Sequence, residues 1–142
     1  MDAKELISEL GSRFGITLEL SDAGTCRVIF DEDAVDFELA GRRLFVMADL
    51  GPVAGGEALL RELLEADYLG AKTFGATISI DSEHDVFSLH AILPAQDDYE
   101  AFEENLTGFV KALREWKEII SSAPLAGEAT QTLDAVAGDI PV

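Results

Sequence analysis

Apolar side chains near the start of the chain recur at spacings of three and four positions, which places them on one face of a helix. The spacing predicts a helix over residues 2–14, which ends where Gly15 can adopt a left-handed backbone. The apolar face consists of Leu6, Ile7, Leu10 and Phe14.

Four short runs rich in β-branched and aromatic residues follow this helix, and turn-forming residues lie between them. In the third run, Val35, Phe37 and Leu39 alternate with acidic residues, so we expect one buried and one wet face for that strand. The pattern is typical of antiparallel hairpins. The predicted strands are residues 16–20, 26–30, 35–39 and 44–50.

Helical spacing resumes after Pro52 and predicts a second helix that reaches Gly70. Two adjacent leucine pairs and Tyr68 give this helix an apolar stripe that is wider than one small sheet would cover. A subunit interface is one use of the stripe, and burial of about half of its leucines in an ordinary core is the other. The leucines are Leu59, Leu60, Leu63 and Leu64.

A second hairpin is predicted at residues 74–80 and 86–93, because alternating and apolar runs flank an acidic turn. Asp97 and Glu100 then imitate a capping box at the start of a long third helix. Pro124 ends that helix.

The predicted elements follow the order helix, strands, helix, two strands, helix, without a repeated βαβ alternation. This order indicates an α+β fold. We predict a single domain over residues 1–123 and a loosely ordered tail over residues 124–142, where periodicity is lost.

Composition narrows the range of partners. The chain is 48% hydrophobic and 27% charged, which is typical of a folded globule, but 28 acidic and only 10 basic residues give it a net charge of −18. Nucleic acid and anionic membrane surfaces would be repelled, so we expect neither as a partner. A basic or amphipathic protein partner suits this charge better.

Catalytic and metal-binding patterns are missing from the sequence. Two histidines and one cysteine do not form a zinc pattern, and the acidic run 31–33 lacks the other ligands of an EF-hand loop. The glycine-rich run 51–56 lacks the Lys-Ser/Thr of a phosphate-binding loop, and Cys26 is interpreted as a packing residue. We therefore expect no metal, no cofactor and no catalysis; a small enzyme that uses carboxylates is the alternative.

The lone cysteine, Cys26, cannot form an intramolecular disulfide, which fits a reducing compartment. Residues 1–5 do not resemble the start of a signal peptide, and no apolar stretch approaches the ~18 residues of a membrane span. A soluble, cytoplasmic protein is expected.

Several segments carry a family pattern in a consistent order along residues 3–120. They are residues 10–15 (Leu-x-x-Phe-Gly in looser form), 22–31, 63–69 and 75–81, with Trp116. Together they resemble the opening, early strands, leucine-rich second helix, fourth strand and terminal helix of class I type III secretion chaperones, a Tir chaperone-like family. Asp67 stands where that family more usually has Asn.

The resemblance implies a twisted antiparallel sheet of about five strands with three helices, in the order α-βββ-α-ββ-α. It also implies a homodimer formed around the second helix and the strand after it, with Leu59, Leu60, Leu63, Leu64, Tyr68, Phe74 and Ile78 as interface candidates. The implied groove candidates are Leu6, Leu10, Phe14, Phe30, Phe37 and Phe45, some of which must instead belong to the core.

The family binds the N-terminal region of a secreted effector, which stays extended over apolar grooves, and keeps it soluble and fit for secretion without hydrolysing ATP. The resemblance therefore implies a bacterial cytoplasmic chaperone with a role in virulence. It is also consistent with the ATPase of the secretion apparatus as a further partner. A regulatory module of the same fold, which sequesters a secretion or transcription regulator, is the alternative.

Overall fold

A computed structural model describes residues 1–94 and 98–124, so the predicted tail lies outside the described residues except for Pro124. Within the described residues, three helices and five strands confirm the predicted α+β order. A short 3-10 turn, η1 (Tyr68–Gly70), extends the second helix. The elements are α1 (Ala3–Arg13), β1 (Thr25–Phe30), β2 (Asp33–Ala40), β3 (Arg43–Pro52), α2 (Glu57–Asp67), β4 (Thr77–Asp81), β5 (Val86–Pro94) and α3 (Tyr99–Ser122).

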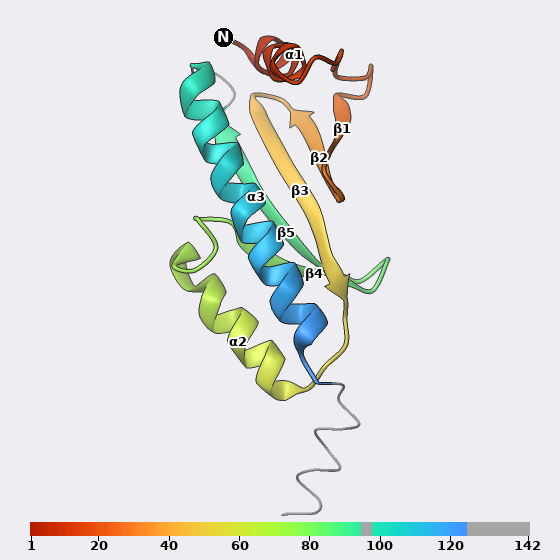
Figure 1. Ribbon diagram of the computed structural model, residues 1–142, viewed down its shortest axis with the longest axis vertical. Helices are drawn as coiled ribbons and strands as arrows, with labels where there is room; N and C mark the ends of the chain where they lie inside the picture. Colours follow the sequence, from red (N-terminus) through yellow and green to blue (C-terminus); the bar gives the residue numbers. More distant parts are fainter. Residues whose placement is uncertain (95–97, 125–142) are drawn as a thin grey trace, which may run out of the picture.

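The five strands form one antiparallel sheet in the order β1-β2-β3-β5-β4 (Figure 1). A register shift between Asp49 and Gly51 marks a bulge in β3, which increases the local twist of the sheet. In the part of the chain that the structure describes, β1 and β4 are the two edge strands.

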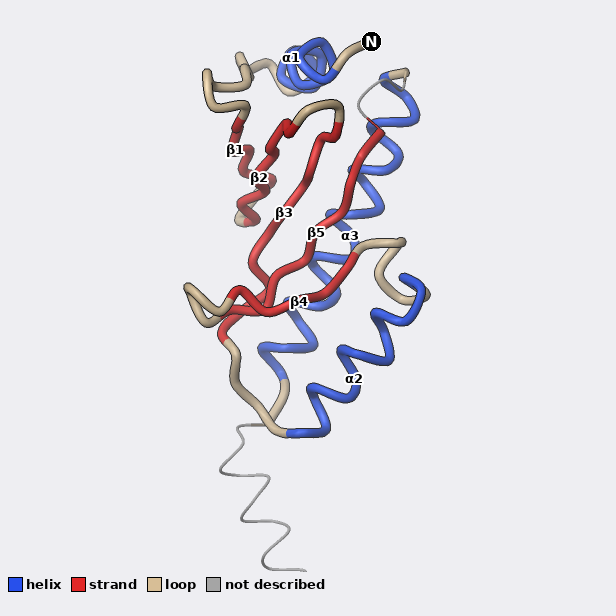
Figure 2. Tube along the Cα trace, turned by 180° about the vertical axis from the view of Figure 1, so that it is seen from behind, coloured by secondary structure: helices blue, strands red, loops and turns tan. Residues whose placement is uncertain are grey.

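One face of the sheet is covered by α3, which packs along β3 and β5. Leu44, Val46 and Ala48 of β3 are buried on this side, whereas the intervening Phe45 and Met47 lie half-buried on the opposite face. Figure 2, viewed from behind, shows no described helix in front of β1, β2 and β3. The alternation along β3 therefore sorts its side chains between a core and a more open face.

The first helix lies across one end of the sheet, at the top of Figure 1. Its capping box is complete, because Asp2 Oδ1 accepts from the Glu5 backbone N–H at 2.9 Å and Glu5 Oε2 accepts from the Asp2 N–H at 3.0 Å. The apolar stripe of the helix faces the core, with Leu6, Ile7 and Leu10 almost fully buried.

The predicted strand at residues 16–20 is wrong, because this segment is a loop. The Ile16 N–H donates to the carbonyl oxygen of Gly11 at 2.9 Å. A Cβ added at Gly11 would lie only 2.7 Å from the Ile16 oxygen and 2.9 Å from the Leu18 nitrogen. The loop thus packs directly on the end of α1 instead of pairing with a strand.

Two boundaries also differ from the prediction. The cap of α3 is Asp98, whose Oδ1 accepts from the Ala101 N–H at 2.8 Å, while Asp97 lies outside the described residues. Strand β4 begins at Thr77, because Phe74 has a φ of 53° that interrupts the extended backbone.

Candidate binding groove

A hollow of about 560 Å³ lies between the end of α1, the edge strand β1 and α3; we call it the groove. Glu103, Lys111 and Arg114 of α3 lie along it, together with Asp31. Most of its lining is apolar and comes from segments far apart in the sequence. The apolar residues are Leu10, Phe14, Ile16, Val28, Ile29, Phe30, Leu106 and Val110.

Phe14 is the aromatic residue that the end of α1 contributes to the groove. It follows the last helical residue, its side chain is 58% exposed, and its ring meets the edge of the Phe30 ring with 5.7 Å between centroids. Gly15 has a φ of 70°, which turns the chain and brings the exposed Ile16 to the same hollow. A helix end and a strand end thus present adjacent aromatic rings to solvent.

The outer edge of β1 offers backbone groups beside this apolar surface. The Leu39 N–H donates to the Gly24 carbonyl at 2.8 Å, which makes these two residues a hydrogen-bonded pair. Alternation along an antiparallel ladder then turns the N–H and C=O groups of Arg27 and Ile29 away from β2, toward the open edge. An extended segment could pair with this edge while its side chains enter the groove.

A charged network closes the groove near the turn between β1 and β2. Arg114 donates from Nε to Asp33 and from its terminal nitrogen to Asp31, both at 2.9 Å, and Lys117 donates to Asp33 at 2.7 Å. Burial raises the pKa of Asp33, but the hydrogen bonds from Lys117 and Arg114 outweigh it and leave that pKa below its ordinary value. Asp33 is therefore a buried but satisfied carboxylate that ties β2 to α3.

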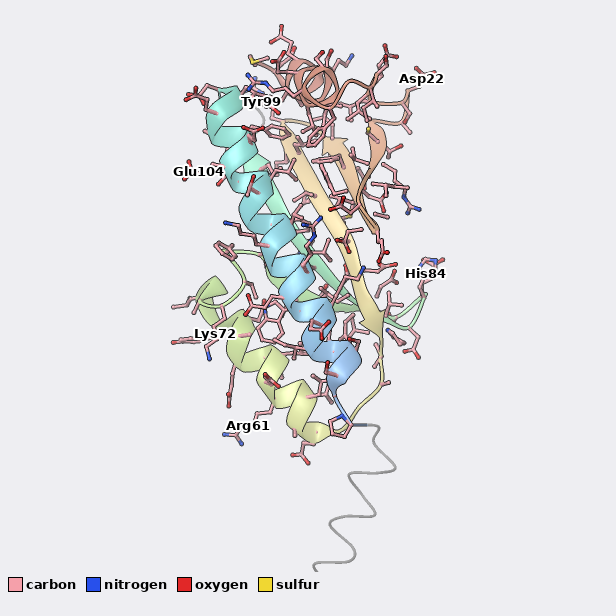
Figure 3. The ribbon with its side chains drawn as sticks, viewed as in Figure 1. Asp22, Arg61, Lys72, His84, Tyr99 and Glu104 are labelled. Atoms are coloured by element: carbon pink, nitrogen blue, oxygen red, sulfur yellow. The ribbon has the colours of Figure 1, made fainter. Side chains whose placement is uncertain are left out.

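The start of α3 is tied to α1 by a second contact. The Arg13 guanidinium lies 4.3 Å from the centre of the Tyr99 ring and also donates to Glu9 at 3.0 Å. Figure 3 shows Tyr99 where the first turn of α3 approaches α1. The contact between Arg13 and Tyr99 thus holds α1 and α3, which form two walls of the groove, in place relative to each other.

Not all of the predicted groove residues lie in the groove. Leu6, Leu10 and Phe37 are at most 1% exposed and belong to the core, although Leu10 also reaches the wall of the groove. Phe14 and Phe30 line it. Phe45 lies on the opposite face of the sheet, so the structure does not bring it to the others.

Five apolar lining residues were not among the predicted groove residues. Leu106 and Val110 lie one turn apart on α3, and their helical spacing was visible in the sequence. Ile16 was assigned to a strand that does not form, and Val28 and Ile29 were placed in a predicted strand but not in the groove. Nothing in the sequence showed that α3 would pass beside β1.

A second apolar surface lies on the outer side of α2; we call it the α2 stripe. Of the predicted interface residues, Leu59, Leu63 and Ile78 are buried within the described chain. The others are exposed, together with one residue that was not predicted, Leu69. The exposed set is Leu60, Leu64, Tyr68, Leu69 and Phe74.

The loop after α2 is anchored at three points. The Trp116 Nε1–H donates to the Lys72 carbonyl at 2.9 Å, and the hydroxyl of the fully buried Thr73 donates to the Ala76 carbonyl at 2.6 Å. Asp67 Oδ1 accepts from the backbone N–H at the start of β4, at 2.7 Å. The flanking Leu69 and Phe74 are nevertheless exposed and have positive φ angles.

The described residues include few other groups of side chains of the kinds that bind metal ions or act as nucleophiles. Asp81, Glu83 and His84 form a mostly exposed cluster in which His84 already pairs with Asp81 at 2.8 Å, and this pairing raises the pKa of His84. Burial raises the pKa of the Cys26 thiol, which keeps it in the less reactive protonated form. No helix in the described ranges has the length and apolar character of a membrane span.

Comparisons with known proteins add family evidence to this geometry. A profile of the Tir chaperone protein (CesT) family matches residues 5–117. Curated protein sequences contain no significant match. The crystal structure of the ExsC–ExsE complex contains a similar chain, with 26% identity and a TM-score of 0.71; the match covers 83% of this chain and 96% of that one.

Two further solved structures are under 25% identical and share the fold. A chain of the HopA1–SchA chaperone–effector complex matches at 19% identity with a TM-score of 0.70, covering 81% of this chain and 92% of that one. The structure of the Yersinia pestis type III secretion chaperone SycH, in complex with a stable fragment of YscM2, matches at 18% identity. Its TM-score is 0.65, and the match covers 80% of this chain and 98% of that one.

Proposed function

Since this chain belongs to the Tir chaperone protein (CesT) family, we propose that it is a type III secretion chaperone that binds an extended N-terminal segment of a secreted effector in the groove. The observation that carries this proposal is an apolar hollow of about 560 Å³ directly beside the open edge of β1. The chaperone acts in the bacterial cytoplasm and holds the segment soluble without catalysing a reaction.

The geometry supports binding by strand addition. The backbone groups of Arg27 and Ile29 can pair with an incoming strand, and every second side chain of that strand then points to the same side. Those side chains pack against Phe14 and Phe30. Backbone pairing supplies affinity for any extended segment, and the apolar wall selects segments with alternating apolar residues.

The test of this function begins with isolation of the tagged chain from its native cytoplasm and identification of its partner by mass spectrometry. The partner's N-terminal segment is then titrated against two variants. Phe14→Asp should weaken binding roughly tenfold or more, because it replaces apolar contact with a charge. Ile92→Asp alters a similarly exposed residue on the opposite face and should leave binding unchanged.

Equal affinity of the two variants for the segment would contradict the proposal that the segment binds in the groove. A secretion or transcription regulator as the isolated partner would favour the regulatory alternative instead. The ATPase of the secretion apparatus stays a predicted partner that the same isolation would reveal.

The α2 stripe supports the further proposal of a homodimer. Leu64 and Tyr68 are each more than 70% exposed and lie one turn apart, a combination that favours contact with a second subunit. Leu64→Asp should give a folded monomer in size-exclusion chromatography with light scattering, while Ile92→Asp should remain dimeric. A wild-type chain that is monomeric at micromolar concentration would refute the dimer.

A further inference from the structure

The groove differs in charge from the molecule as a whole. The chain has 28 acidic and 10 basic residues, whereas acids and bases are equally frequent among the charged residues that line the groove. These charged lining residues are Asp31, Glu103, Lys111 and Arg114. The acidic excess of the chain therefore does not extend into the groove, and its individual charges decide which client residues fit there.

Three of these four charged residues already have partners. Arg114 donates to Asp31 at 2.9 Å, and the Tyr99 hydroxyl donates to Glu103 at 3.4 Å. Lys111 is exposed, and the described part of the chain gives it neither an ion pair nor a side-chain hydrogen bond. The unpaired charge in the groove is thus a cation.

Lys111 belongs to a row of basic residues along α3. Lys111, Arg114 and Lys117 follow one another at intervals of three positions, so successive members are neighbours on the helix surface. Arg114 and Lys117 are occupied by the carboxylates of Asp31 and Asp33. Three cations therefore meet two carboxylates at this end of the groove, and the charge of Lys111 is the one left over.

This charge lies next to the apolar wall of the groove. Val110 precedes Lys111 and is one of the apolar lining residues. Arg114, one turn further along α3, donates to the Phe30 carbonyl at 3.4 Å, which places the cationic end of the groove where β1 ends. In a strand added to the edge of β1, side chains two positions apart point to the same side. One such strand can therefore present apolar side chains to the wall and a charged one to the long, flexible side chain of Lys111.

We infer that Lys111 pairs with an acidic side chain of the bound client segment, at the end of the groove beside Phe30. The inference rests on the proposed function and adds to it that the client segment carries an aspartate or glutamate among its alternating apolar residues. It needs no residue of the α2 stripe to be free.

The inference also differs from the expectation that the net charge of −18 favours a basic partner. The net charge acts over long distances and influences how often two proteins meet. The charge at Lys111 acts at contact distance and determines which residue of the segment is preferred there.

Peptide selection on the immobilised full-length chain tests the inference. The probe is a library of random dodecapeptides displayed on phage, selected on the wild type, on Lys111→Met and on Lys4→Met. Methionine keeps an unbranched stem and removes the charge. Lys4→Met is the control, because Lys4 is exposed and does not line the groove. The wild type and the control should enrich Asp and Glu about two- to fivefold at one position relative to the apolar residues, and Lys111→Met should not.

A selected peptide then enters a double-mutant cycle. Replacement of its acidic residue by the corresponding amide should weaken binding to the wild type and to Lys4→Met about two- to fivefold, and should leave binding to Lys111→Met unchanged. No acidic enrichment on the wild type, or an equal effect of the amide on Lys111→Met, would overturn the inference.

The same selection separates this inference from the proposed function. Alternating apolar peptides whose binding is lost in Phe14→Asp support the groove whether or not an acidic residue is enriched among them. Selected peptides whose binding does not depend on Phe14 would contradict the groove, and the inference with it.

Discussion

Arg114 on α3 donates from Nε to Asp33 Oδ2 on β2 at 2.9 Å, although the two residues are 81 positions apart in the chain. The same guanidinium reaches Asp31, and Lys117 completes the shell around the Asp33 carboxylate. This contact sets where α3 lies relative to the turn between β1 and β2. It thereby sets the position of one end of the groove.

Removal of the Asp33 charge should destabilise the protein in a pH-dependent way. Asp33→Asn should lower the free energy of unfolding by about 1 to 2 kcal/mol at pH 7, because charged hydrogen bonds from Arg114 and Lys117 are weakened. The pKa of Asp33 is lowered in the folded state, so this stabilisation is complete above its ordinary value of 3.8 and is lost as the pH falls through the lowered value.

Urea unfolding of both proteins between pH 7 and pH 2.5 measures the difference, which should shrink only below about pH 4. Asp36→Asn is the control, because Asp36 pairs with the exposed Arg27 and should change stability by less than about 1 kcal/mol. A pH-independent difference for Asp33→Asn would contradict this assignment.

Leu10 in α1 and Phe14, the residue after its end, are four positions apart but should respond differently to truncation. Leu10→Ala should cost about 2 to 5 kcal/mol of unfolding free energy, because Leu10 is 1% exposed. Phe14→Ala should cost less than about 1 kcal/mol, since most of its side chain is in solvent and only its contact with Phe30 is lost. Equal costs in chemical denaturation would place Phe14 in the core.

Replacement of Leu69 by glycine should stabilise the folded protein. Its backbone has a φ of 55° and its side chain is 87% exposed, so Leu69→Gly relieves left-handed strain of about 1 kcal/mol and removes few contacts. Glu62→Gly, at an exposed position in the middle of α2, is the control and should lose about 1 kcal/mol. A loss in both variants, measured by thermal unfolding, would show that Leu69 makes stabilising contacts in solution.

Asp67 should tolerate asparagine but not alanine. Its Oδ1 accepts from the Ile78 N–H at 2.7 Å, and the amide oxygen of asparagine can accept the same hydrogen bond. Asp67→Ala leaves a partly buried N–H without its acceptor and should cost about 1 to 2 kcal/mol. Hydrogen exchange at Ile78 should accelerate in Asp67→Ala and stay slow in Asp67→Asn; fast exchange in both would show that charge is required.

The sequence by itself determined the order and type of the main elements, because helical and strand periodicities are local properties of the chain. The long apolar stripe of α3 was predicted for the same reason. The net charge of −18 likewise needs no structure. The loop at residues 16–20 was mistaken for a strand because its composition suits one, while its hydrogen bond goes to the end of α1.

Only the tertiary structure decided which apolar residues are core and which are surface. Leu63 and Leu64 are neighbours in one stripe, yet Leu63 is buried and Leu64 is exposed. The same division separates Leu10 from Phe14. Burial depends on which distant element covers each face of a helix, and that is set by packing between segments far apart in the chain, such as the contact of Arg114 with Asp33. Sequence periodicity marks an apolar face, but it does not say what lies against it.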